Sequence, residues 1–230
     1  MNQRDLNNSA QPNQDALGKI YGQHSHWQNV FATNPQMYGT SASQAGFYAI
    51  SRFTTVGFTK ILELGAGQGR DTIAFLRAGF DVTAVDFANE ALNEIRNLAG
   101  EGLSQHLSTL AQDVRLPLEF ADQTFDACYA HMLFTMALTT KELEALASQV
   151  YRVLRPGGMC IYTVRHIGDP HFRQGTHLGE NLYENGGFIV QFFDNELVNR
   201  VGKHFTIEDI HEFEEGQLPR KLWRVTMLKN

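Results

Sequence analysis

The sequence has few cysteines, few prolines and no long hydrophobic run. Two of its 230 residues are cysteines and six are prolines. Cys128 and Cys160 both lie in apolar segments, so we expect buried, reduced thiols rather than a disulfide framework. The uncharged and largely apolar stretch from Ala127 to Thr140 is too short to span a bilayer, so no membrane partner is expected. The polar N-terminal residues contain no signal-peptide core, and a cytoplasmic location is expected.

Positive charge is also scarce. The chain has 25 acidic against 19 basic residues, a formal net charge of −6. A broad surface for nucleic acid normally needs the opposite sign, so we expect no nucleic-acid partner. Hydrophobic residues make up 43% of the chain, which is enough to bury a core and excludes a disordered protein. The length fits one α/β domain with extensions, acting as a monomer or homodimer.

The chain divides into three parts by composition. Residues 1–18 are polar and have no core-forming pattern, which indicates a tail. Residues 19–58 are rich in aromatic residues at helical spacing, and they predict a helical cap. Residues 59–230 alternate strands with helices and form the predicted main domain.

The main domain begins with βαβ units. Strands are predicted at 60–65, 81–86, 107–112, 125–131 and 159–165, and helices at 70–78, 89–99 and 141–154. A Pro-Gly-Gly turn is predicted at 156–158. Strands separated by helices in this way indicate a parallel sheet with helices on both faces.

The C-terminal part has a different pattern. Residues 166–188 are polar and rich in glycine, which predicts an irregular inserted loop. A short helix is predicted at 194–202, followed by two late strands at 205–213 and 222–228.

The strongest motif is the segment ELGAGQGRD, residues 63–71, between the first strand and the first helix of the main domain. Gly65 allows a tight turn, and Gly67 lets the backbone approach a ligand closely. Asp86 ends the next strand, 21 positions after Gly65. An acid at that place can accept hydrogen bonds from both ribose hydroxyls of an adenine nucleoside.

Two ligand classes compete for this loop. A dinucleotide loop usually has the spacing G-x-G-x-x-G, because the pyrophosphate sits on the helix N-terminus. Here the spacing is G-x-G-x-G, and Arg70 stands where the third dinucleotide glycine would fall. Glu63 suits a ligand with an ammonium group and is poorly placed beside a pyrophosphate. A nucleoside with a cationic amino-acid tail is therefore favoured over NAD.

The motifs together resemble those of the class I S-adenosylmethionine (SAM)-dependent methyltransferases. The segments ELGAGQGRD, AVDF, QDVRLPLEFADQTFDACYAH and RVLRPGGMCIYTV follow one another between Ile61 and Val164. The GQGRD variant is similar to the small-molecule branch that includes tellurite-resistance and thiopurine-type enzymes. The resemblance implies a Rossmann-like α/β fold with SAM as cofactor. It also implies a seven-stranded, mostly parallel sheet, with helices on both faces and an antiparallel last strand.

The resemblance also implies residue roles. Residues expected at the methionine part of the cofactor are Glu63, Gly65, Ala66 and Gly67. Residues expected at the nucleoside are Asp86 at the ribose, and Phe87, Asp113 and Val114 at the adenine. Ala130 and His131 would lie under the sulfonium and face the substrate. Tyr21, Trp27 and Tyr38 are candidates for a roof over the cofactor, although each also suits ordinary packing of a helical cap.

Methyl transfer from a sulfonium is an in-line displacement that mainly requires alignment and the exclusion of water. A general base is needed only if the acceptor is protonated at neutral pH. The candidates are His131, at the end of a strand, and His166, in the inserted segment. The alternative for His131 is a structural histidine at a strand terminus, but its position slightly favours a functional role. His166, His171 and His177 have irregular spacing, which favours a polar lid over a metal site.

The sequence thus predicts methyl transfer to a small molecule. The N-P-P-Y-type signature of amino-methylating DNA enzymes is absent after the fourth strand, where residues 131–134 read HMLF. Three alternatives remain open. They are a noncatalytic SAM-binding protein, an NAD-dependent oxidoreductase, and a methyltransferase acting on protein or RNA through a groove supplied by residues 166–188.

Overall fold

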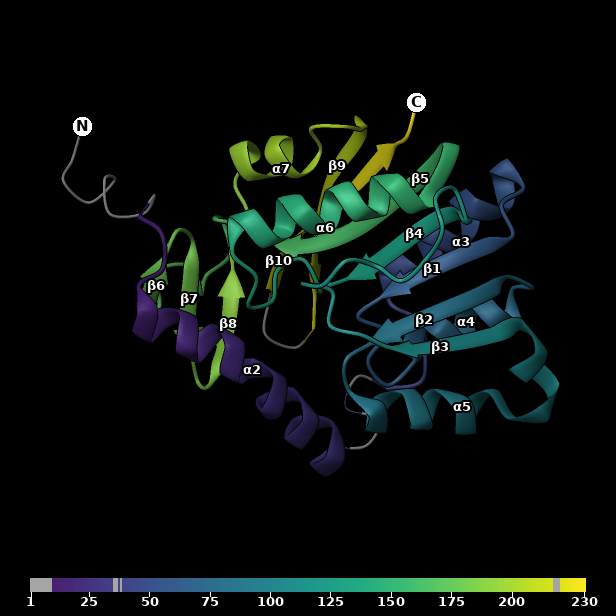
Figure 1. The fold of residues 1–230 in the computed structure, drawn as a ribbon, viewed down its shortest axis with the longest axis horizontal. Coiled ribbons are helices and arrows are strands. Elements are labelled where there is room, and N and C mark those ends of the chain that lie inside the picture. The colour runs from purple at the N-terminus through teal and green to yellow at the C-terminus, as the bar shows by residue number, and fades with distance from the viewer. Residues whose placement is uncertain (1–9, 35–36, 38, 217–219) are drawn as a thin grey trace.

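The computed structural model describes residues 10–34, 37, 39–216 and 220–230. Its centre is a seven-stranded sheet with the order β3-β2-β1-β4-β5-β10-β9 (Figure 1). The strands are β1 (Lys60–Leu64), β2 (Asp81–Asp86), β3 (Leu107–Ala111), β4 (Phe125–His131), β5 (Leu154–Arg165), β9 (Thr206–Glu215) and β10 (Arg220–Leu228). Only β10 runs antiparallel to its neighbours β5 and β9. The predicted Rossmann-like sheet with an antiparallel last strand is confirmed.

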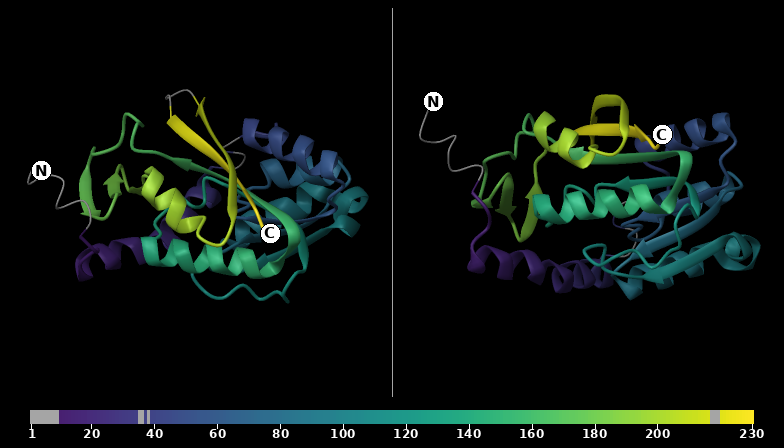
Figure 2. Two further views of the ribbon diagram at one scale, coloured as in Figure 1. Left: turned by 90° about the horizontal axis from the view of Figure 1, so that it is seen from above. Right: turned by 45° about the horizontal axis from the view of Figure 1, so that its top comes forward.

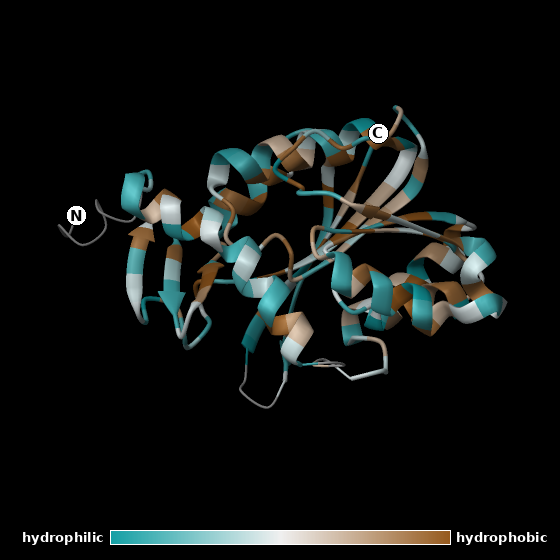
Figure 3. Cartoon of the chain, turned by 60° about the horizontal axis from the view of Figure 1, so that its bottom comes forward, coloured by the Kyte–Doolittle hydropathy of each residue, from teal (hydrophilic) through white to brown (hydrophobic). Residues whose placement is uncertain are grey.

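Helices cover both faces of this sheet (Figure 2). One face carries α3 (Gln44–Val56), α4 (Arg70–Arg77) and α5 (Asn89–Leu103). The other face carries α6 (Thr140–Val153) and α7 (Asn195–Val201). Figure 3 shows hydrophobic residues concentrated on the strands and on the helix sides that face them. Burial of these apolar faces provides most of the stabilisation of such a layered fold.

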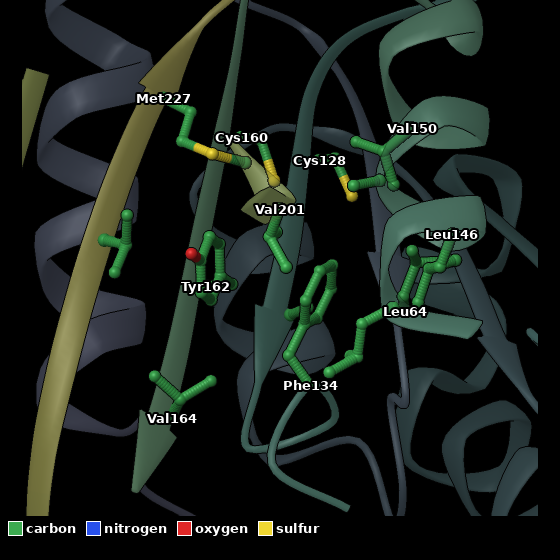
Figure 4. Close-up of a cluster of buried hydrophobic side chains, with 14 of the residues drawn as sticks. Leu64, Cys128, Phe134, Leu146, Val150, Cys160, Tyr162, Val164, Val201 and Met227 are labelled. Carbon is green, nitrogen blue, oxygen red and sulfur yellow. The ribbon is translucent and has the colours of Figure 1, made fainter. Parts of the chain in front are cut away.

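The core under α6 contains both cysteines. Cys128 and Cys160 are fully buried and free, as the sequence predicted. Beside them the rings of Phe134 and Tyr162 stack with centroids 4.7 Å apart (Figure 4). Within the described part of the chain, no helix has both the length and the apolar character needed to cross a membrane.

The N-terminal helix α2 (Gln14–Thr33) lies apart from the large sheet, against α5 and the strand β8 (Figure 1). It begins inside the segment 1–18 that was expected to be a tail, and residues 1–9 of that segment lie outside the described residues. The expected cap, 19–58, is divided between two places. Helix α3 packs into the core through Phe53, whereas α2 buries only Ala16 and Ile20.

The prediction of an irregular loop at 166–188 was wrong for its second half. This segment forms a three-stranded antiparallel sheet, hereafter the small sheet, together with the residues that follow it. Its strands are β6 (Thr176–Gly179), β7 (Leu182–Asn185) and β8 (Phe188–Gln191). Each strand has four residues, and Gly186 and Gly187 form the second turn with positive φ. Strands this short, interrupted by glycine, have no alternating pattern long enough to detect.

Two boundaries also differ from the prediction. The Pro-Gly-Gly segment is a bulge inside β5 rather than a turn before it, because the pairing with β4 jumps from Leu154 to Met159. Gly157 has φ +76° at this bulge, and its N–H donates to the Lys229 carbonyl at 2.8 Å. The helix expected to close at Gly100 has a break in its backbone there, and a further turn extends to Leu103.

Candidate functional site

The glycine loop joins β1 to α4. Gly65 has φ +70° and Gly69 has φ +84°, which are values that glycine adopts without strain. A Cβ at Gly65 would lie 2.9 Å from the Leu133 side chain, and a Cβ at Gly69 would lie 2.6 Å from Ile95. Glycine is therefore required at both positions by backbone conformation and by packing.

A cavity of about 840 Å³ opens beside this loop, at the carboxyl ends of β1, β2 and β4. The strand order reverses between β1 and β4, which is where open α/β sheets bind ligands. The helix α2 and the small sheet supply further walls. The lining includes eight of the residues predicted for the site: Trp27, Glu63, Gly65, Ala66, Gly67, Asp86, Phe87 and His131.

Glu63 is a buried acid in the cavity wall, with 3% of its surface exposed. Burial is the largest cause that raises the pKa of its carboxyl group well above the ordinary value, and repulsion by Asp71 and Asp86 adds to it. The hydroxyl of Thr72 donates a hydrogen bond to Glu63 at 2.6 Å and partly offsets these effects. A cationic group in the cavity would stabilise the charged form of Glu63.

Asp86 fixes the loop and faces the cavity. One of its carboxylate oxygens accepts from the Gly67 N–H at 2.8 Å, and the other accepts from the Ala88 N–H at 2.9 Å. Burial raises the pKa of Asp86, and these backbone hydrogen bonds counteract that rise. A carboxylate has about four lone-pair sites, so Asp86 retains capacity for ligand hydroxyls.

Aromatic side chains of α2 cover the glycine loop. The Phe31 ring lies 3.6 Å from the place that a Cβ of Gly67 would occupy, and Trp27 packs on Phe31 with ring centroids 5.5 Å apart. The ring of Phe87 meets His24 of α2 at 4.4 Å. Of the residues predicted as a roof over the cofactor, Trp27 thus lines the cavity, together with Phe31, which sequence reasoning missed. Tyr38 lies outside the described residues.

Asp113 and Val114, which were predicted at the nucleoside, do not line the cavity. The roof candidate Tyr21 does not line it either. Asp113 accepts three hydrogen bonds from the Arg115 side chain, at 2.6–3.0 Å. Burial would raise the pKa of Asp113, but these bonds and the charge of Arg115 outweigh it and lower the pKa. Arg115 also lies 5.1 Å from the ring of Tyr21, which is 51% exposed. Val114 is partly buried and packs against the core below α6.

Ala130 and His166 also lie outside the cavity lining. Ala130 is fully buried in the core under α6, because successive side chains of β4 point to opposite faces of the sheet. His166 stacks on Trp223 with ring centroids 4.5 Å apart, and its Nδ1 accepts from the Gly168 N–H. Burial lowers the pKa of His166 despite the nearby acid Glu212. His166 is therefore packed away from the cavity in which a base would act.

His131 reaches the cavity but both of its ring nitrogens are engaged. Nδ1 lies 2.9 Å from the Thr163 hydroxyl, and Nε2 lies 3.0 Å from a carboxylate oxygen of Glu215. Glu215 also pairs with Arg70 at 3.3 Å. Burial would raise the pKa of Glu215, but the hydrogen bond and charge of His131 and the charge of Arg70 together lower it. In this arrangement His131 has no free nitrogen to accept a proton.

A second polar group lies where β5 ends, and sequence reasoning missed most of it. The Arg165 guanidinium binds both oxygens of Asp169, packs 5.1 Å from the Phe192 ring and donates to Nδ1 of His171 at 2.7 Å. Arg165 and His171 line the cavity. No sequence signal identifies this group, because it depends on how the chain turns after β5. Within the described residues, no cluster of three or more potential metal ligands is found.

The comparisons with known proteins agree with this geometry. The family described as "Methyltransferase domain" matches residues 61–158. Methyltransferase phqN of Penicillium fellutanum is 33% identical over 100 residues, which cover 43% of this chain and 29% of that protein. Malonyl-[acyl-carrier protein] O-methyltransferase of Salmonella typhimurium is 23% identical over 181 residues, covering 78% of this chain and 66% of that protein. The chain thus spans less than two thirds of the length of either relative.

A solved structure is similar over nearly the whole chain. The 1,6-didemethyltoxoflavin-N1-methyltransferase of Burkholderia thailandensis, crystallised with 1,6-didemethyltoxoflavin and S-adenosylhomocysteine (SAH), aligns with a TM-score of 0.72. The alignment covers 96% of this chain and 92% of that one at 19% identity. At this identity the likeness shows that the overall fold is shared.

Proposed function

We propose that this chain is a class I SAM-dependent methyltransferase, and that it transfers a methyl group from SAM to a small-molecule acceptor bound in the same cavity. Bound there, SAM supplies a methyl group on a positively charged sulfur. The observation that carries the proposal is a single cavity that joins Glu63 and Asp86 to the small sheet. One end suits the cofactor, and the other end has room for an acceptor.

The cofactor end is built for an aminoacyl nucleoside. The buried carboxylate of Glu63 would hold the ammonium group, and that contact would offset the cost of its burial. Asp86 would accept from the ribose hydroxyls while it keeps its bonds to the loop backbone. Phe87 would pack against the adenine. Asp113 and Tyr21 are occupied by Arg115 and take no part in this proposal.

The acceptor end lies beside His131 and the small sheet. Trp27 and Phe188, with ring centroids 5.4 Å apart, bring α2 and β8 together and would exclude water from the reacting atoms. Enclosure by these two elements favours a small acceptor over a polymer. Because both nitrogens of His131 are hydrogen-bonded, we propose that His131 orients the acceptor and does not remove a proton.

The test is transfer of labelled methyl groups. The protein would be incubated with methyl-labelled SAM and a cell extract separated by size into metabolite and macromolecular fractions. We expect the label in the metabolite fraction, together with formation of SAH. Label confined to the macromolecular fraction would contradict the small-molecule acceptor. SAM binding with no transfer to either fraction would indicate a noncatalytic SAM-binding protein.

A further inference from the structure

The two ends of the cavity differ in charge. At the glycine-loop end, the carboxyl groups of Glu63 and Asp86 face the interior. At the other end, hereafter the basic end, the cavity is lined by Arg165, His171 and Arg220. The methyl-transfer proposal assigns the acidic end to the cofactor and leaves the basic end without a ligand. Arg165 is buried and His171 and Arg220 are partly buried, and together they offer N–H donors to a ligand in the cavity.

Arg165 is the fixed centre of the basic end. Only 9% of its side chain is exposed, and the side chain of its partner Asp169 is fully buried. The Nε and Nη2 atoms of Arg165 are used by Asp169 and His171. Within the described part of the chain, Nη1 has no hydrogen-bond partner. Arg165 is therefore held in place, with one donor group left for a ligand.

His171 presents a further donor. A guanidinium group has no acceptor atom, so Nδ1 of His171 must accept the hydrogen bond from Arg165. The proton of the neutral ring is then on Nε2, the other nitrogen of a residue that lines the cavity. Nη1 of Arg165 and Nε2 of His171 are thus two N–H donors for a ligand. The hydrogen bond between the two side chains fixes their relative position.

The acids near the basic end already have partners. Asp169 pairs with Arg165, and Glu215 pairs with Arg70 of the glycine loop and with His131. Arg220 is the ladder partner of Glu215 across β10 and β9, so its charge lies close to this group. The excess of positive charge is small, so it suits the single negative charge of a carboxylate better than the charge of a phosphate.

The walls around these donors are apolar. Phe192 lines the cavity beside Arg165, whose guanidinium lies 5.1 Å from the Phe192 ring. Trp27 and Phe188, with ring centroids 5.4 Å apart, line the same cavity where α2 meets β8. Aromatic walls favour a flat apolar body, because offset and edge contacts between rings add to burial.

We propose that the methyl acceptor is an organic monocarboxylate with a flat apolar body, and that Arg165, His171 and Arg220 bind its carboxylate. Arginine and a carboxylate form short, charge-assisted hydrogen bonds, which are stronger than neutral ones. The inference rests on the proposed methyl transfer, because it concerns the acceptor end of the same cavity.

The test compares three probes of the same size and different charge. The probes are 2-naphthoate, 2-naphthamide and 2-naphthylmethylamine, titrated by calorimetry into protein saturated with SAH. We expect 2-naphthoate to bind at least about tenfold more tightly than the amide, because a hydrogen bond to a charged group contributes more. The amine should bind most weakly. Equal affinities of naphthoate and amide, or tighter binding of the amine, would overturn the inference.

Two variants locate the binding. Arg220→Gln removes one positive charge, and His171→Asn keeps an acceptor for Arg165 but removes the Nε2 donor. Each should weaken naphthoate binding about tenfold and weaken amide binding by less, because a hydrogen bond to a neutral group contributes less. Arg200→Gln on α7, where the arginine is exposed and paired with Glu144, is the matched control and should change neither. Unchanged naphthoate affinity in both variants would place the anion elsewhere and refute the assignment.

The titration of SAH itself separates the two levels of the proposal. If SAH binds and naphthoate shows no preference, only the carboxylate inference fails. If SAH does not bind to the ligand-free protein, the methyl-transfer proposal fails and this inference falls with it.

Discussion

Replacing Glu63 by glutamine should raise the stability of the ligand-free protein and lower its affinity for SAH. The carboxyl group of Glu63 is buried in the cavity wall, and burial followed by the repulsion of Asp71 raises its pKa. Glu63→Gln keeps the size and an acceptor for the Thr72 hydroxyl, but it removes the buried charge. The two consequences have opposite signs, so stability and affinity must be measured on the same variant.

The pH dependence follows from the direction of the shift. A carboxyl group with a raised folded-state pKa favours folding when it is protonated, and this contribution is lost as the pH rises through the folded-state pKa. The wild type should therefore lose stability relative to Glu63→Gln as the pH rises from the ordinary glutamate range through the folded-state pKa of Glu63. Urea unfolding of both proteins without ligand, at pH 5 and at pH 8, measures this difference. The control is Glu101→Gln on α5, where the carboxylate is exposed and no such trend is expected.

The loss of SAH affinity in Glu63→Gln follows from the strength of one hydrogen bond to a charged group. A hydrogen bond to a charged group contributes about 1.5–3 kcal/mol, so Glu63→Gln should weaken SAH binding roughly 10- to 150-fold. Calorimetric titration of SAH into both proteins gives the ratio. Unchanged SAH affinity would refute the ammonium assignment. A ligand-free variant that is less stable than the wild type at pH 8 would refute the argument from burial.

Three other substitutions test separate parts of the site. Asp86→Ala should weaken SAH binding by about 1.5–3 kcal/mol in the same titration, and wild-type affinity would disprove its ribose contact. Gly69→Ala should destabilise the protein by about 1–3 kcal/mol in urea unfolding. The control Gly102→Ala, where a Cβ would meet open space on α5, should not destabilise it. Equal effects of the two substitutions would contradict the steric argument. Glu215 has a lowered pKa, so it stabilises the fold above the ordinary glutamate range, and this contribution is lost as the pH falls through its folded-state pKa. The stability difference between the wild type and Glu215→Gln should thus shrink from pH 7 to pH 3, and a constant difference would mean that the pair with His131 is not ionic.

The sequence predicted the part of the fold that depends on local pattern. β2 and β4 have the predicted bounds, and the glycine loop lies where the motif indicated. These elements are recognisable because apolar runs and glycine positions act over a few neighbouring residues. The small sheet was missed because its four-residue strands carry no such pattern.

The candidate site was predictable only where a motif defined it. Glu63 and Asp86 follow from their places at the ends of strands, and both face the cavity. Arg165 and Glu215 could not be found in this way, because their roles depend on contacts between distant segments. His166 shows the reverse error. Its position after β5 suggested a base, but stacking on Trp223 removes it from the cavity.

The most direct test of the central claim is thermal unfolding with SAM, SAH or NAD added separately. A ligand at one hundred times its dissociation constant adds about 2.7 kcal/mol to the stability of the folded state, which is readily measured. We expect stabilisation by SAM and by SAH and none by NAD. Stabilisation by NAD alone would contradict the assignment of SAM as cofactor and would leave only the fold.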